Sequence, residues 1–341
     1  MRAILLAAVL GLAVGLFSLG SLSGMGAGDQ LPCTVIVQPG ESIQAAIDKA
    51  KEGAVICLAE GTWEENLVIG KGLTLRGLGP GKSVIKGSRG PVILITSDTE
   101  IEVIVEGLTI AEAKTGDYYY KEPLRHPIGL SLGGKVKATI KGNAISGNED
   151  DGISMWDSAQ ATISGNTISG NRYDGIYMHD AQATIEKNTI SENYYYGIGM
   201  GSYAQATIQG NAISGNRDDG IYMGGSAQAT IQGNTISGNE GSGISMYDSA
   251  RANISGNTIS GNGVGIGMGD AAQATIEGNK ITENKFYGVA LAQRPCIYKD
   301  YIFGGAVRGR ANEIWGNTGV CPAELKFLMT EAGGCYGPKC Y

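Results

Sequence analysis

A repeat of 22 or 23 residues constrains this 341-residue chain more than any other feature of its sequence. An Asn-x-Ile-x-x-Asn hexad recurs at intervals of 23, 22, 23, 23, 23 and 22 residues, and a further copy follows after 33 residues. The hexads begin at Asn143, Asn166, Asn188, Asn211, Asn234, Asn257, Asn279 and Asn312. A period of this length is typical of solenoid proteins, in which each repeat packs only against its neighbours.

Each repeat contains three short apolar pieces, "ATI", "TIS" or "AIS", and "GIYM" or "GISM", separated by polar turns. Residues alternate within each piece, and no piece is long enough for a helix, so each piece is predicted to be a strand. Stacked repeats then predict an all-β, parallel solenoid with three sheets, in which equivalent side chains form columns spaced ~4.8 Å apart. The isoleucines, such as Ile153, Ile163 and Ile168, are predicted to point inward. Asn and Gly are expected to supply left-handed backbone at the corners.

The two ends of a solenoid need covering, because they expose apolar side chains and unpaired strand edges. Residues 41–53 place apolar side chains, among them Ile43 and Ile47, on one helical face, which predicts an N-terminal capping helix. Residues 319–341 are predicted to form a disulfide-containing C-terminal cap. The β-helix itself is expected to span residues 28–318.

The opening "ESIQAAIDKAKEGAVICLAEGTWEENLVIGKGLTLRGLGPGKSVIKG", followed by repeated "NTISGN" and "DGIYM" units, resembles the right-handed parallel β-helix proteins of the pectate-lyase-like superfamily. Within that superfamily the repeats are similar to the branch called carbohydrate-binding and sugar-hydrolysing, which includes the NosD-like periplasmic proteins. The likeness covers about residues 36–318 and implies the fold. It implies much less about activity, because the superfamily holds lyases, hydrolases, epimerases, adhesins and non-enzymes.

The N-terminus has the order of a secretory signal: Arg2, an apolar run from Ala3 to Phe17, and small residues up to Gly28. Residues 1–27 are therefore predicted to be a signal peptide, with an uncleaved membrane anchor as the alternative. The mature chain is expected to be secreted or periplasmic, without a membrane span. A formal charge of −7 without a basic tract argues against nucleic acid as a partner.

Six cysteines fit an oxidising compartment, where disulfides persist. Nearness in the sequence favours three pairs, although other pairings stay open. The favoured pairs are Cys33 with Cys57, Cys296 with Cys321, and Cys335 with Cys340. Zinc binding is the rival interpretation, but no two cysteines have Cys-x-x-Cys spacing.

Acidic residues recur in the turn before the "GIxM" pieces, where Asp151 and Asp174 fall on adjacent coils. Carboxylates at that spacing are close enough to share a proton or to hold a calcium ion, and calcium is the one cofactor we expect here. In the superfamily that this chain resembles, acids and an arginine on the outside of one sheet do such work. The alternative is that Asp, Asn and Gly are simply good turn residues.

Aromatic and polar side chains are expected to point outward from the same sheet and its turns. Aromatic rings beside carboxylates suit sugars, which stack on rings and hydrogen-bond at their rims. The predicted sugar-binding residues on this sheet are Trp156, Asp157, Arg172, Tyr173, Tyr177, His179, Asp180, Tyr222 and Tyr247. The register of His179 is open by one position, because the coil is one residue shorter after Met178. The alternative is that tyrosine is simply favoured on exposed β-surfaces.

Two other columns are assigned to structure. Methionines such as Met178 and Met200 come two positions after inward isoleucines and are predicted to fill the core, although thioethers also bind Cu(I). Outward threonines such as Thr162 and Thr184 form a hydroxyl array that resembles ice-binding solenoids. A single column matches those proteins poorly, and threonine is common on exposed strands.

Two insertions, residues 113–129 and 292–310, interrupt the repeat. Loops over a rigid scaffold often carry functional sites, and the first groups acids, bases and rings. Its candidate residues are Tyr118 and Tyr119 for sugar binding, and Arg125 and His126 for catalysis together with Asp151 and Asp174. A loop without function is the alternative.

The sequence thus predicts a β-helix that binds a polysaccharide or cell-surface glycan. Most of the chain follows the repeat, and few segments depart from it. This favours binding over catalysis, because an active site needs a unique cluster of residues whereas a binding surface can be repetitive. If the protein is an enzyme, we expect a polysaccharide lyase or a glycoside hydrolase. The alternative is a non-enzymatic envelope scaffold, an adhesin, or a NosD-like factor for maturation of a copper enzyme.

Overall fold

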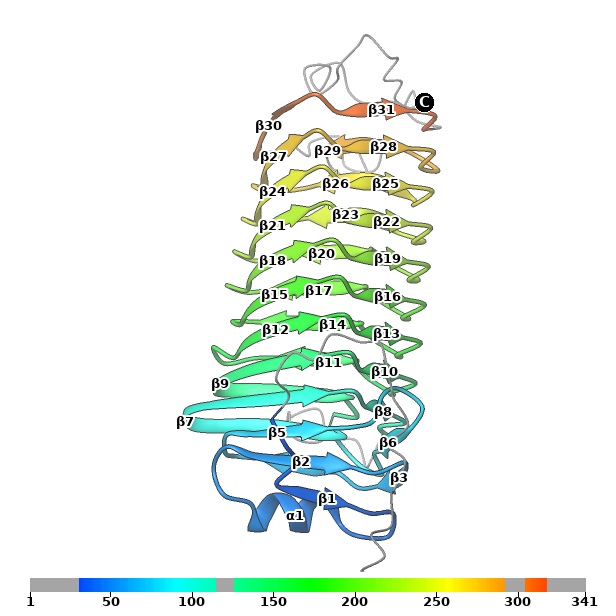
Figure 1. Cartoon of the computed structure of the whole chain (residues 1–341). Coiled ribbons are helices and arrows are strands. Elements are labelled where there is room, and N and C mark those ends of the chain that lie inside the picture. Colours follow the sequence, from blue (N-terminus) through cyan, green and yellow to red (C-terminus); the bar gives the residue numbers. More distant parts are fainter. Residues whose placement is uncertain (1–30, 115–125, 292–303, 318–341) are drawn as a thin grey trace, which may run out of the picture. The chain divides into compact units, whose positions relative to one another are not determined.

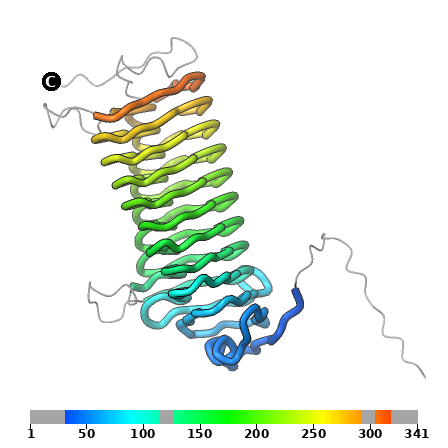
Figure 2. The backbone as a smooth tube through the Cα atoms, turned by 90° about the vertical axis from the view of Figure 1, so that its left-hand side faces the viewer, coloured from blue at the N-terminus to red at the C-terminus, as the bar shows by residue number. Residues whose placement is uncertain are grey.

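The predicted repeats form the turns of a parallel β-solenoid in the computed structural model, which describes residues 31–114, 126–291 and 304–317. From Cys33 onward these residues belong to one unit, in which each turn lies directly on the previous one (Figures 1 and 2). The predicted signal peptide and C-terminal cap lie outside the described residues.

Three ladders of parallel strands run along the solenoid, one for each predicted piece. The GIxM ladder contains β11 (Ile153–Met155), β14 (Ile176–His179), β17 (Ile198–Gly201), β20 (Ile221–Met223), β23 (Ser242–Met246), β26 (Val264–Met268) and β29 (Val289–Leu291). The QATI ladder contains β12 (Gln160–Ser164), β15 (Gln182–Glu186), β18 (Gln205–Gln209), β21 (Gln228–Gln232), β24 (Arg251–Ser255), β27 (Gln273–Glu277) and β30 (Ala306–Arg310). The TIS ladder contains β10 (Ala144–Ser146), β13 (Thr167–Ser169), β16 (Thr189–Ser191), β19 (Ala212–Ser214), β22 (Thr235–Ser237), β25 (Thr258–Ser260), β28 (Lys280–Thr282) and β31 (Glu313–Trp315).

The N-terminal coils are less regular, as their sequence suggests. They contain β1 (Val35–Val37), α1 (Ile43–Lys49), β2 (Ala54–Leu58), β3 (Gly61–Glu64), β4 (Leu67–Ile69), β5 (Leu73–Arg76), β6 (Ser83–Lys86), β7 (Ile93–Glu106), β8 (Thr109–Ala111) and β9 (Leu130–Lys141). The long strands β7 and β9 continue from the GIxM ladder into the QATI ladder. Within the described residues these two ladders therefore form one 20-stranded sheet, and the TIS ladder belongs to an 11-stranded sheet.

The core is a stack of identical side chains, because the strands pair in register. Ile163 pairs with Ile185, and Met155 with Met178, and the pattern repeats turn after turn. These inward isoleucines and methionines have no exposed surface, which confirms both assignments. Pairing of His179 with Gly201 also fixes the register that the sequence leaves open.

The corner asparagines behave differently from the prediction. The positive φ values at these corners belong to the preceding residue, which is usually a glycine such as Gly165 and in some coils another residue such as Lys187 or Glu283. The asparagines are buried instead, and their side chains form hydrogen-bonded ladders along the axis. Asn211, for example, donates from Nδ2 to the carbonyl oxygen of Ile185 (2.8 Å) and to Oδ1 of Asn234 (2.9 Å). The prediction was wrong for Asn because its buried amide group must be hydrogen-bonded, and it finds its partners on the neighbouring turns.

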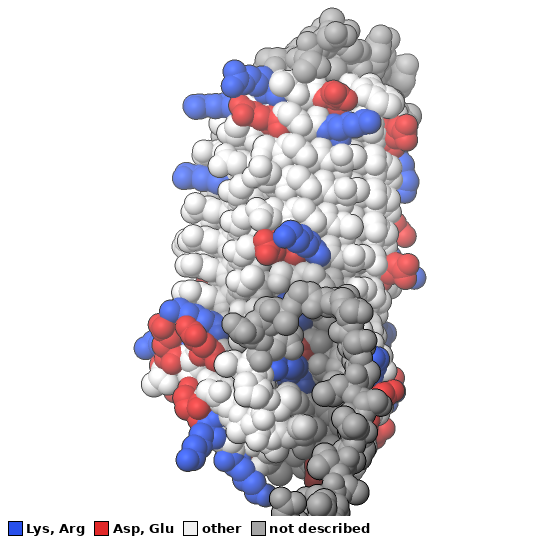
Figure 3. Space-filling model, in the orientation of Figure 1, with Lys and Arg blue, Asp and Glu red and all other residues white. Residues whose placement is uncertain are grey.

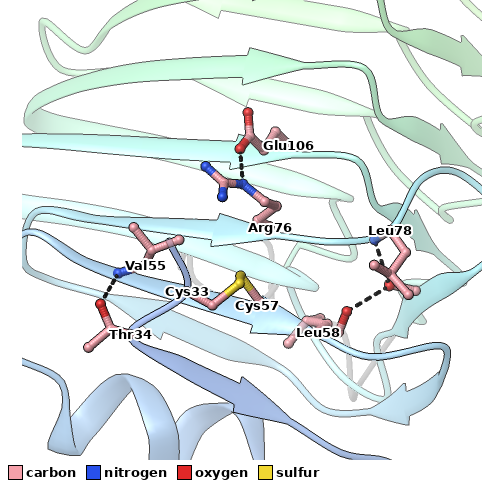
Figure 4. Close-up of a disulfide and its surroundings, with 9 residues drawn as sticks. Cys33, Thr34, Val55, Cys57, Leu58, Arg76, Leu78 and Glu106 are labelled. Atoms are coloured by element: carbon pink, nitrogen blue, oxygen red, sulfur yellow. Dashed lines mark hydrogen bonds and ion pairs between the residues drawn. A yellow bond between two sulfur atoms is a disulfide. The ribbon is translucent and has the colours of Figure 1, made fainter. Parts of the chain in front are cut away.

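The N-terminal end is covered by α1, as predicted, although the helix is shorter than the stretch 41–53. Ser42 caps the helix by accepting a hydrogen bond from the backbone N–H of Ala45, and Ile43 and Ile47 are buried. The predicted disulfide between Cys33 and Cys57 is also present, with the Cα atoms 5.7 Å apart. It ties the chain before β1 to β2 (Figure 4). The other four cysteines lie outside the described residues.

Candidate functional site

Five tyrosine rings form a continuous line across the outside of the solenoid, which we call the tyrosine belt: Tyr173, Tyr195, Tyr196, Tyr222 and Tyr247. The successive ring centroids are 5.1, 5.9, 4.6 and 6.1 Å apart. Two of the four contacts, Tyr173 with Tyr195 and Tyr196 with Tyr222, are parallel stacks. Such contacts stabilise aromatic pairs by about 0.5–1.5 kcal/mol beyond burial, so the belt holds its own shape.

The belt crosses four coils because its members occupy different places in the repeat. Tyr173, Tyr195 and Tyr196 lie in the turns that precede β14 and β17, whereas Tyr222 is the outward residue of β20 and Tyr247 follows β23. The line therefore runs obliquely from a corner of the solenoid onto the GIxM ladder. Tyr173 and Tyr195 are 42% and 40% exposed, which leaves aromatic surface available to a ligand.

Two further rings lie against the same ladder, where glycines replace outward side chains. The indole ring of Trp156 occupies the space that a Cβ would take at Gly133, and its Nε1 donates to Oγ of Ser131 (3.1 Å). Tyr177 lies along β17, with its ring beside Gly199 and its hydroxyl beside Gly201. Trp156 and Tyr177 thus extend the aromatic surface toward the N-terminal coils.

Buried aspartates lie beside the belt, in the turns before β11, β14 and β20. We call Asp151, Asp174 and Asp219 the acid column, and each is at most 7% exposed. Each carboxylate accepts a backbone N–H from the next coil: Asp151 from Asp174, Asp174 from Tyr196 (2.9 Å), and Asp219 from Ser242. These acids therefore bridge the coils, in agreement with the turn-forming alternative.

Burial also changes their protonation. Desolvation raises the pKa of Asp174 to about 8 and that of Asp219 to about 6, since hydrogen bonds from the next coil offset only part of its effect. The pKa of Asp151 lies well above its ordinary value because of burial and the neighbouring charge of Asp174. Asp174 is therefore largely protonated at neutral pH, which is unusual for a carboxyl group near a protein surface.

Asp157 and Asp180 take left-handed conformations in the turn after the GIxM strands. Asp180 accepts a hydrogen bond from the backbone N–H of Tyr203 (3.1 Å), and its pKa is lowered mainly by a hydrogen bond from the hydroxyl of Ser202. His179 is exposed, with Nδ1 3.1 Å from Oδ2 of Asp180. Their predicted contact with sugar stays a prediction.

The candidate catalytic residues are only partly described. Nδ1 of His126 lies 2.7 Å from Oδ2 of Asp150, so the structure places this histidine beside the aspartates of the turn before β11. Arg125, Tyr118 and Tyr119 lie outside the described residues. Arg172 is exposed on the turn before β14.

Arg217, in the same column as Arg172 and two coils away, lies over the ring of Tyr194, 4.9 Å from the centroid. This places an aromatic ring and a cation at the corner beside the belt, where Tyr194 is 52% exposed. Figure 3 shows a largely uncharged stretch on the face that it presents, below a group of charged side chains at the upper end.

Within the described residues, no group of three or more His, Cys, Asp or Glu side chains is arranged to hold a metal ion. Calcium at Asp151 and Asp174 stays a prediction. Because both pKa values are raised, a cation there would have to displace protons, and its binding would strengthen as the pH rises.

Sequence reasoning missed two features of this surface. It placed Tyr194, Tyr195 and Tyr196 only among the aromatic groups of the turn, and did not identify Tyr196 as the ring that links the corner to the ladder. It also gave no role to Gly199. The signal was present in "YYYGIGMG", where glycines fill both outward positions of the strand directly after a turn of three tyrosines.

A stack of parallel strand ladders with buried isoleucine, methionine and asparagine columns defines the class of parallel β-helix proteins. The sequence matches the family described as right handed beta helix region over residues 82–202 and 151–299. The chain belongs to this family. No curated protein sequence matches it significantly.

Solved structures with the same fold include the A-modules of two Azotobacter vinelandii mannuronan C-5 epimerases. The AlgE6 module is 21% identical, with 87% of this chain and 91% of that chain covered and a TM-score of 0.63. The AlgE4 module is 20% identical, with 81% and 94% covered and a TM-score of 0.57. The Dettilon tailspike protein is 15% identical, with 83% and 68% covered and a TM-score of 0.58. At these identities the likeness establishes the fold.

In the part of the chain that the structure describes, no helix has the length and apolarity needed to cross a bilayer.

Proposed function

We propose that this protein binds a polysaccharide along the tyrosine belt, outside the cytoplasm. The observation that carries the proposal is the belt itself: five rings spaced 4.6–6.1 Å apart along an oblique line over four coils. An extended ligand with many weak contacts suits such a line better than a compact one. Sugar rings stack on aromatic faces through their C–H groups, and polar side chains at the rim form hydrogen bonds with the sugar hydroxyl groups.

Three further points support a glycan. The chain carries a predicted signal peptide over residues 1–27, which suits a secreted or periplasmic protein. Solved structures with the same fold include proteins whose names record action on mannuronan. The surface of Tyr194 and Arg217 continues the belt at the corner with groups that stack and hydrogen-bond.

Binding to a polysaccharide array, with and without Ca²⁺, tests the proposal. Tyr195→Ala combined with Tyr222→Ala should weaken binding at least about tenfold, which corresponds to about 1.4 kcal/mol. Tyr203→Ala is the matched control, because Tyr203 is 71% exposed and has no ring contact with the belt among the described residues. The control variant should bind like the unmodified protein.

Absence of binding to any glycan would refute the proposal and favour the scaffold, adhesin or maturation-factor alternative. Equal losses for the double variant and for Tyr203→Ala would also count against the belt. The same samples should be assayed for release of unsaturated or reducing ends. Such release would add lyase or hydrolase activity to binding, and His126 and Asp150 would then be the first residues to replace.

A further inference from the structure

The acid column contains one carboxylate oxygen that differs from its equivalents. Oδ1 of Asp219 accepts the N–H of Ser242, and Oδ2 accepts the hydroxyl of Ser245. Oδ1 of Asp174 accepts the N–H of Tyr196 in the same way. Among the residues that the structure describes, Oδ2 of Asp174 has no hydrogen-bond partner, although the residue is buried.

The register of the ladder explains the difference. Ser245 lies on the coil after Asp219, where it is the outward residue that pairs with Tyr222. The equivalent residue on the coil after Asp174 is Gly199, which pairs with Tyr177. A Cβ at Gly199 would overlap Oδ2 of Asp174, so the glycine leaves this oxygen the space that a serine fills elsewhere. The chain thus lacks this internal partner at Asp174 and keeps it at Asp219, two coils away.

The surroundings of Oδ2 are aromatic. The rings of Tyr177 and Tyr196 both approach the place where a side chain at Gly199 would begin. Asp174 keeps 5% of its surface exposed, and no side-chain oxygen or nitrogen of the described residues is both fully buried and unpartnered. Oδ2 therefore reaches the surface between two rings of the aromatic face.

The charges that face Asp174 are negative. Asp150 and Asp218 lie close enough to disfavour its ionised form, and the charge of Asp174 in turn raises the pKa of Asp151. Three basic residues lie nearby: Arg217 covers Tyr194, Arg172 is exposed on its turn, and Nδ1 of His126 lies 2.7 Å from Oδ2 of Asp150. A ligand carboxylate placed at Oδ2 would meet repulsion from these acids, whereas a hydroxyl group would not.

We propose that Oδ2 of Asp174 hydrogen-bonds a hydroxyl group of a neutral sugar that stacks on Tyr177, and that this subsite selects neutral sugars over uronates. The inference rests on the proposed polysaccharide binding and names its substrate class. A polar group between two aromatic rings fixes the orientation of a stacked sugar, which stacking alone leaves free. Since the pKa of Asp174 is about 8, its carboxyl group donates this hydrogen bond at neutral pH.

The test compares neutral β-linked oligosaccharides, such as gluco-, manno-, xylo- and galacto-oligosaccharides, with oligouronates, by calorimetry on the full chain at pH 6 and pH 9. We expect a neutral oligosaccharide to bind at least about tenfold more tightly than any oligouronate at pH 6. Its affinity should fall at pH 9, where Asp174 ionises. Asp174→Asn should keep its affinity at pH 9, because its amide nitrogen still donates a hydrogen bond.

Gly199→Ser supplies the internal partner that Asp219 already has, and it should weaken neutral-sugar binding about tenfold. Gly267→Ser is the matched control, because Gly267 is an outward glycine of the same ladder that pairs with Ser245 and lies beyond the acid column. It should bind like the unmodified protein. Thermal unfolding of both variants shows whether either change disturbs the fold.

Several results would overturn the inference. Preference for uronates, or neutral binding that is indifferent to Gly199→Ser and to pH, would remove Asp174 from the site while leaving the belt proposal standing. Loss of binding in the belt variants with no change in Gly199→Ser would exclude Asp174 in the same way. Failure of every glycan to bind overturns the belt and the subsite together. If Gly199→Ser unfolds, the pH profiles of the unmodified protein and Asp174→Asn still decide whether Asp174 contacts the sugar.

Discussion

Replacing Asp174 by asparagine should make this protein more stable at neutral and alkaline pH. Asparagine keeps an acceptor oxygen for the N–H of Tyr196, which Asp174 uses to bridge the coils. It removes only the ability to ionise. Asp174 is only 5% exposed in the folded chain. Ionising its carboxyl group therefore costs free energy in the folded state that the solvated unfolded state does not incur.

The magnitude follows from proton linkage. The pKa of Asp174 is about 8 in the folded chain, against roughly 3.9 in an unfolded one. Between these values the unfolded state has released its proton while the folded state holds it, so the free energy of unfolding falls by about 1.4 kcal/mol per pH unit. The loss is absent below about pH 4, reaches about 4 kcal/mol at pH 7, and levels off above about pH 8.

The assay is thermal unfolding of the unmodified protein and Asp174→Asn across pH 4 to pH 9, followed by circular dichroism. The two melting temperatures should be similar near pH 4 and diverge steadily up to pH 8, with the variant higher. Asp151 and Asp219 also carry raised pKa values, so the variant should keep part of the pH dependence. The informative quantity is therefore the difference between the two curves.

Asp180→Asn is the matched control, because Asp180 lies on the same coil but is exposed and has a lowered pKa. Its ionised form is favoured in the folded state, so its contribution to stability is constant above about pH 4 and is lost only below that value. The curves of Asp180→Asn and of the unmodified protein should therefore run parallel from about pH 5 to pH 9. Parallel curves for the unmodified protein and Asp174→Asn would refute the reasoning. They would mean that Asp174 ionises freely in the folded chain and that the acid column is better solvated than its burial indicates.

Three further predictions concern the scaffold. Replacing Cys33 and Cys57 by serine should lower the free energy of unfolding by about 3 kcal/mol, because the disulfide closes a loop across 24 residues. Reduction of the unmodified protein by a thiol should lower its melting temperature equally. Equal melting temperatures with and without thiol would contradict this prediction. Asn211→Ala should cost about 3 kcal/mol or more in chemical unfolding, since it breaks bridges to both neighbouring coils, whereas the exposed Gln209→Ala should change little. Met200→Leu should cost less than about 1.5 kcal/mol in the same assay, and a larger loss would show that the methionine column does more than fill the core.

The sequence by itself determined the scaffold, because in a solenoid every coil meets the same environment. One period therefore assigns the inward isoleucines and methionines of all coils at once, and Ile163 and Met178 are buried as predicted. The cap helix and the pairing of Cys33 with Cys57 followed from equally local signals. Such features depend on residues close in sequence or related by the repeat.

The tertiary structure decided what lies between the coils. Whether Asn166 adopts a left-handed corner or bridges two turns depends on the asparagine at the equivalent position of the next turn, which a single repeat does not contain. The contact between Tyr196 and Tyr222 joins a turn of one coil to a strand of the next, and the unpartnered oxygen of Asp174 depends on Gly199 one coil away. Periodicity predicts the residues that recur, whereas these sites arise where neighbouring coils differ, and only packing brings those differences together.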